Sequence, residues 1–116
     1  MTVRVASEPS AVTRSEVEHL LTYLERSGCD FERNGTWYNA VDARAHLEKK
    51  YRYLVDRDLV TKAEDFIARA AAQSSMSGQP YQVRCAGTRA TPSAAWLTNE
   101  LQRYRQVQSQ SRKPTN

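Results

Sequence analysis

Hydrophobic residues recur at helical spacing in four stretches of the chain. They predict helices over about residues 13–27, 39–56, 61–70 and 92–107, because apolar residues three or four positions apart lie on one face of a helix. Four apolar stripes are expected to face the core: Val17, Leu20, Leu21 and Leu24; Ala43, Leu47, Tyr51, Leu54 and Val55; Ala63, Phe66, Ile67 and Ala70; and Trp96, Leu97, Leu101 and Tyr104.

The expected helix starts carry suitable capping residues. Thr13 and Ser15 are both candidate N-caps of the first helix, and the segment Thr61–Glu64 has the composition of a capping box. Thr91-Pro92 is typical of an N-cap followed by proline in the first turn. These signals predict where each helix begins, independently of the apolar stripes.

Between the first two helices the polar and apolar residues alternate instead. Asn34-Gly35 is a strong signal for a two-residue hairpin turn, so Phe31–Arg33 and Thr36–Tyr38 are predicted to be short antiparallel strands. Residues 81–85 alternate in the same way and are expected to pair with this hairpin. The predicted fold class is therefore α+β, with four helices and a small three-stranded antiparallel sheet.

The chain has 116 residues, which fits one domain. Residues 1–12 are polar and are expected to form a flexible N-terminal segment, residues 13–107 the single α+β domain, and residues 108–116 a flexible basic tail. No apolar run is long enough to span a membrane. Residues 1–12 contain no apolar stretch of the kind found in a signal peptide, which is compatible with a cytosolic protein. They equally resemble the polar residues that follow a cleaved leader, so both locations stay open at this point.

The net charge of +4 comes from one end of the chain. Residues 1–100 contain all 13 acidic residues and 13 of the 17 Lys and Arg residues. The excess lies in Arg103, Arg105, Arg112 and Lys113. A nucleic-acid-binding protein needs a basic face on the folded surface, so this pattern argues against nucleic acid as a partner and leaves weak binding of an anionic surface by the tail as an alternative.

The two cysteines, Cys29 and Cys85, lie at the edges of predicted strands. Their 56-residue separation excludes a CxxC redox motif, and with only His19 and His46 to add, a structural zinc site is not expected. The pair is compatible with a disulfide between the hairpin and the third strand or with two buried thiols. No motif for a cofactor or a metal is present, so neither is predicted.

The candidate binding residues are side chains suited to polar or aromatic contacts. Trp and Arg are common interface anchors, which makes the hairpin a candidate contact surface, and the serine-rich loop 74–78 is a candidate ligand contact. A serine of residues 74–77 with His46 as base would be needed for a small hydrolase, although no GxSxG motif is present. The predicted binding set is Arg33, Trp37, His46, Ser75, Ser77 and Tyr81.

Several strings together resemble a family of small bacterial proteins of unknown function, the YfeK-like family. The resemblance covers roughly residues 15–105 and rests on Ser27–Gly35, Ala45–Tyr51, Ala63–Ile67, Ser74–Tyr81 and Trp96-Leu97. It implies export to the periplasm with removal of a signal peptide. In that oxidising compartment a Cys29–Cys85 disulfide is expected.

The sequence favours a non-enzymatic periplasmic module that binds a protein or a small molecule. The hydrolase and the basic-tail binder are the alternatives. The resemblance adds no catalytic residue to either, and it implies that the string around His46 and the Ser74–Tyr81 string belong to one architecture.

Overall fold

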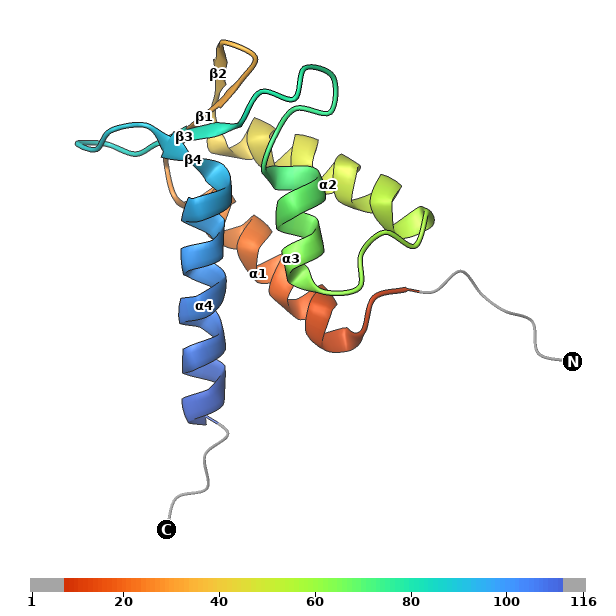
Figure 1. Ribbon diagram of the computed structural model, residues 1–116. Helices are drawn as coiled ribbons and strands as arrows, with labels where there is room; N and C mark the ends of the chain where they lie inside the picture. The colour runs from red at the N-terminus through yellow and green to blue at the C-terminus, as the bar shows by residue number, and fades with distance from the viewer. Residues whose placement is uncertain (1–7, 112–116) are drawn as a thin grey trace, which may run out of the picture.

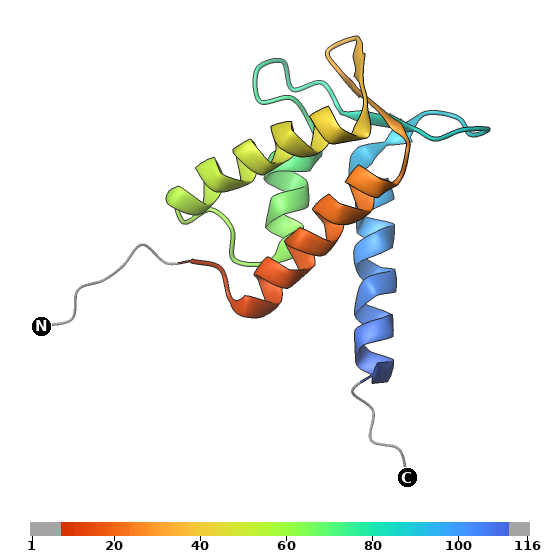
Figure 2. The same cartoon turned by 180° about the vertical axis from the view of Figure 1, so that it is seen from behind.

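The computed structural model describes residues 8–111. Its helices are α1 (Ala11–Arg26), α2 (Ala40–Asp56), α3 (Ala63–Phe66), which continues as a π-helical turn η1 (Ile67–Ala71), and α4 (Ser93–Ser111). Its strands are β1 (Asp30–Arg33), β2 (Thr36–Tyr38), β3 (Gln82–Arg84) and β4 (Thr91–Pro92). The sheet sits at one end of a helical layer in which α1 contacts α2, α3 and α4 (Figures 1 and 2). The α+β class is confirmed.

The sheet has four strands, so the expected three-stranded sheet is corrected. All pairs are antiparallel in the order β2-β1-β3-β4. Thr91 and Pro92, predicted to cap the last helix, instead pair with β3 as an edge strand. Proline has no backbone N–H to donate, and an edge strand tolerates this because one of its sides has no neighbouring strand. The backbone N–H of Ser93 then donates to the Tyr81 carbonyl, and α4 begins at Ser93.

The hairpin forms as predicted. Asn34 and Gly35 both have positive φ, 53° and 84°, as a two-residue turn of this kind requires. The register pairs Phe31 with Tyr38 on β2 and with Val83 on β3. Strand alternation therefore places Arg33 on the same face as Phe31.

The Cys29–Cys85 disulfide is confirmed. Asp30 pairs with Arg84, so the two cysteines lie opposite each other at the ends of β1 and β3, with their Cα atoms 4.2 Å apart. The bond closes the segment that contains the hairpin, α2, α3 and β3. It therefore fixes the strand that carries Arg33 against the strand that follows the serine-rich loop.

The predicted apolar stripes form one core. Leu20, Leu24, Phe66 and Leu97 are almost completely buried, and Phe31 and Val83 cover the core from the sheet. None of the helices within residues 8–111 is long and apolar enough to cross a membrane.

Two predicted helix starts are corrected. Helix α1 begins after Ser10, whose hydroxyl accepts a hydrogen bond from the Thr13 N–H, while the Thr13 hydroxyl donates to the Thr61 carbonyl. At α3 the carboxylate of Asp65, and not that of Glu64, accepts the N–H groups of Thr61 and Lys62.

Two arginines of the basic C-terminal region pair inside the domain. Arg105 bridges Glu16 of α1 and Glu64 of α3, and Arg103 pairs with Glu100. The Arg105 guanidinium holds the pKa of Glu64 down to about 2. Two of the four basic residues that make up the positive excess are therefore ion-paired within the fold, while Arg112 and Lys113 lie outside the described residues.

Candidate functional site

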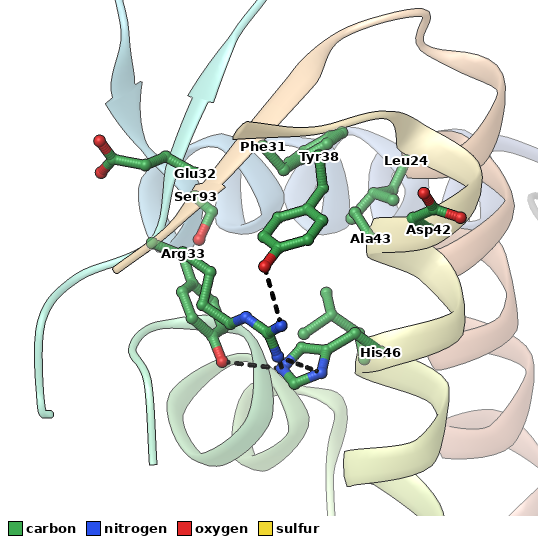
Figure 3. Close-up of a pocket in the computed structure, with 11 residues that line it drawn as sticks. Leu24, Phe31, Glu32, Arg33, Tyr38, Asp42, Ala43, His46 and Ser93 are labelled. Atoms are coloured by element: carbon green, nitrogen blue, oxygen red, sulfur yellow. Dashed lines mark hydrogen bonds between the residues drawn. The ribbon is translucent and has the colours of Figure 1, made fainter. Parts of the chain in front are cut away.

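A half-buried arginine without an acidic partner stands at the end of β1. Arg33 Nη1 donates to His46 Nδ1 at 2.8 Å, and Nη2 donates to the Tyr38 hydroxyl at 3.1 Å (Figure 3). Its guanidinium carbon lies 4.9 Å from the centre of the Tyr38 ring. No salt bridge joins Arg33 to a carboxylate among residues 8–111. The cation is held entirely by neutral groups.

His46, on α2, is the main acceptor for this arginine. A guanidinium can only donate, so a neutral His46 must offer it an unprotonated ring nitrogen. Arg33 Nη1 lies 2.8 Å from Nδ1 and 3.2 Å from Nε2, and Nε2 also lies 3.1 Å from the Tyr81 hydroxyl oxygen. Burial and the charges of Arg33, Lys50 and Lys49 lower the pKa of His46 to about 4. The imidazole is therefore neutral near pH 7.

Lys50 lies one helical turn after His46 and reaches the same tyrosine. Its Nζ donates to the Tyr81 hydroxyl and to the Gln73 carbonyl, each at 3.1 Å. Burial and the charge of Arg33 lower the pKa of Lys50 to about 8. The Tyr81 oxygen thus accepts a hydrogen bond from Lys50 and forms a second hydrogen bond with His46 Nε2. We call Arg33, Tyr38, His46, Lys50 and Tyr81 the Arg33 cluster.

Two hollows meet at the Arg33 cluster. One is an apolar cavity of about 180 Å³, whose floor is formed by Leu24, Phe31, Ala43 and Leu47. The other is a larger, open cleft of about 680 Å³ between the hairpin, α2 and the serine-rich loop. Arg33, Tyr38, His46 and Tyr81 line both.

The cleft is lined by cations and by no acidic side chain. Arg33, Lys49, Lys50 and Arg69 all line it, together with Asn34, Ser74 and Ser75. None of these four cations forms a salt bridge among residues 8–111. Five other arginines, Arg14, Arg44, Arg52, Arg103 and Arg105, are paired with carboxylates. Four cations without a carboxylate partner among the described residues thus line a single cleft.

The serine-rich loop is fastened to the hairpin by Asn34. The Asn34 amide nitrogen donates to Ser74 Oγ at 3.1 Å, and the Ser77 hydroxyl donates to the Asn34 side-chain oxygen. The N–H groups of Met76 and Ser77 also donate to Ser74 Oγ. This network closes the loop on itself and holds one wall of the cleft at the hairpin tip.

The structure brings together only part of the predicted binding set. Arg33, His46 and Tyr81 form the centre of the site, and Ser75 lines the cleft. Ser77 lies beside the hairpin turn, where it lines a shallower depression. Trp37 lies on the other face of the sheet, where Arg84 stacks on its ring at 4.0 Å.

The groups expected in a serine hydrolase are not connected. Both ring nitrogens of His46 are occupied by Arg33 and Tyr81, and no hydrogen bond joins this histidine to Ser74, Ser75 or Ser77 in the part of the chain that the structure describes. Its low pKa also makes it a poor base near neutral pH.

Tyr38, Lys50 and Arg69 belong to the site but were not predicted. Lys50 follows His46 by four positions, so helical spacing places both on the same face of α2. The register of the hairpin places Tyr38 opposite Phe31. These two signals are present in the sequence. Arg69 reaches the cleft only through the path of η1, which no local pattern predicts.

The low pKa of His46 predicts acid sensitivity. The unfolded chain takes up a proton at His46 near pH 6.5, whereas the folded protein takes it up near pH 4. The stabilisation is present above pH 6.5 and is lost as the pH falls towards 4. In urea unfolding between pH 7 and 4, the wild type should lose stability more steeply than His46→Gln. If the free energy of unfolding depends on pH equally in both proteins, or if NMR gives a His46 pKa near 6.5, the prediction is contradicted.

No group of three or more His, Cys, Asp or Glu side chains within residues 8–111 is placed to hold a metal ion. Compared with known protein families, residues 11–105 match a model described as a family of unknown function (DUF5329). Neither the curated proteins nor the solved structures give a match.

Proposed function

Because the chain belongs to the DUF5329 family, whose function is unknown, we propose a function from the Arg33 cluster itself: the protein is a non-enzymatic binding module for a small anionic molecule. The observation that carries this proposal is the half-buried guanidinium of Arg33. It is surrounded by neutral hydrogen-bonding groups and by further cations.

Keeping such a cation in the apo protein is costly. Removing a charge from water is unfavourable unless an opposite charge accompanies it, and Lys50 adds repulsion at the same site. The lowered pKa values of His46 and Lys50 result first from burial and second from this positive environment. An anion in the cleft would offset the repulsion and supply the missing charge partner.

The hydrogen-bonding groups that remain open are donors. Arg33 Nε–H has no acceptor among the described residues, and the Tyr38 hydroxyl proton is free to donate, since its oxygen already accepts from Arg33. A site rich in open donors suits a carboxylate or phosphate oxygen, which only accepts. A neutral ligand would leave these donors less well satisfied.

We further propose that the protein works in an oxidising compartment, such as the bacterial periplasm, after removal of a leader. The Cys29–Cys85 disulfide supports this location because cytosolic thiols are kept reduced. The resemblance to the exported YfeK-like proteins implies the same compartment.

The test is an NMR titration of the oxidised, isotope-labelled protein at constant ionic strength. Acetate, benzoate and inorganic phosphate are the anionic probes, and acetamide is the neutral control. We expect at least one anion to shift the signals of Arg33 Nε–H, His46 and Tyr81 along a saturating curve. Unchanged signals with all three anions, or equal shifts with acetamide, would overturn the proposed function.

A further inference from the structure

We propose that the ligand of this site is a monocarboxylate with a compact apolar body, no larger than a phenyl ring. This inference rests on the proposed function and deepens it. It is carried by the position of Arg33 at the boundary between an apolar cavity and a cationic cleft.

The apolar cavity is lined by residues that are far apart in the sequence. Leu24 comes from α1, Phe31 from β1, and Ala43 and Leu47 from α2, while Tyr81 precedes β3. Figure 3 shows the Tyr38 ring at the side of this hollow, with its hydroxyl directed to the Arg33 guanidinium. A carboxylate on the open N–H groups of Arg33 would therefore have hydrocarbon-lined space directly beside it.

The volume limits the size of the apolar body. An apolar cavity of roughly 150 Å³ in another protein holds one benzene molecule. The cavity here measures about 180 Å³, so it has room for a phenyl ring or a short alkyl chain and for little more. A long acyl chain would not fit inside it.

The charges around the cavity favour a single negative group. Glu32 and Asp42 lie at its margin, and their carboxylates point away from the Arg33 cluster (Figure 3). A second anionic group at that end would be repelled by them. Arg33 lines both hollows and the other cations line only the cleft, so the arrangement orients a monoanion with its carboxylate at Arg33 and its apolar body in the cavity.

The test compares acetate, butanoate, benzoate and phosphate by isothermal titration of the oxidised full chain. Affinity should rise about fourfold for each methylene group that enters the cavity, and benzoate should bind at least about tenfold more tightly than acetate. Phosphate, which has no apolar body, should bind no more tightly than acetate.

A filled-cavity variant isolates the apolar contribution. Ala43→Leu places extra carbon atoms in the cavity and leaves the Arg33 cluster intact, while Ala45→Leu, on the exposed face of the same helix, is the matched control. We expect Ala43→Leu to bind benzoate at least tenfold more weakly and acetate almost unchanged, and Ala45→Leu to behave as the wild type. Melting curves of both variants serve as the control for folding.

The outcomes separate the two proposals. Benzoate preferred over acetate in the wild type and lost in Ala43→Leu supports the inference. Acetate and phosphate that bind as tightly as benzoate, or a benzoate preference retained in Ala43→Leu, would overturn the inference and leave anion binding in place. Failure of all four anions to bind would overturn both.

Discussion

Loss of the Cys29–Cys85 disulfide is expected to lower the free energy of unfolding by about 4 kcal/mol. The bond joins residues 56 positions apart, and a cross-link that closes so long a loop removes much of the conformational freedom of the unfolded chain. For a chain of this length the loss corresponds to a melting temperature about 15 °C lower. Urea unfolding of the double variant Cys29→Ala, Cys85→Ala against the oxidised wild type measures it.

The expected loss has two controls. Reduced wild-type protein should match the double variant, since both lack the cross-link and differ only at two small side chains, of which Cys29 is buried and Cys85 is partly buried. Thiol counting on the native, unreduced protein should detect no reactive thiol. A loss below about 1 kcal/mol would contradict the stabilising role. Detection of two reactive thiols would show that the disulfide is absent, and the support for an oxidising compartment would then be lost.

Arg33→Gln is expected to weaken anion binding at least about 30-fold, because it removes the charge and the donors that face the ligand. The same change should leave the stability of the ligand-free protein unchanged or raise it slightly. The cation has no acidic partner in the fold, so its removal relieves repulsion with Lys50. The pKa of His46 should also rise from about 4, since the charge of Arg33 contributes to its lowering.

The matched control is Arg89→Gln. Arg89 is an exposed residue of the loop between β3 and β4, and its substitution changes the net charge by the same amount. Its binding should stay within about twofold of the wild type, because exposed charges far from a site are screened by salt. If Arg33→Gln instead unfolds at a clearly lower denaturant concentration and still binds the anion, Arg33 is a structural residue.

The helices and the hairpin were predictable because their signals are local. The stripe Val17, Leu20, Leu21 and Leu24 is buried as expected, and Asn34-Gly35 forms the turn. Strand β4 was not predictable, because Thr91-Pro92 resembles a helix start and pairs with β3 only once the sheet exists. Thr13 is likewise not the N-cap of α1, because its hydroxyl donates to the Thr61 carbonyl, which is distant in the sequence.

The site was predicted in part. Arg33, His46 and Tyr81 were selected from the sequence, and they meet in the fold. Lys50 was not selected because it lies in a charged run, and its half-buried position depends on contacts with Gln73 and Tyr81, which are distant in the sequence. Trp37 has the composition of an interface anchor, but strand alternation turns it to the other face of the sheet.

The most direct measurement is a calorimetric titration of the oxidised protein with benzoate, made side by side on the wild type, Arg33→Gln and Arg89→Gln. We expect saturable one-site binding to the wild type and to Arg89→Gln, and a loss of affinity of at least about 30-fold in Arg33→Gln. Equal binding by all three proteins, or no saturable heat with the wild type, would contradict the assignment of Arg33 as the centre of an anion-binding site.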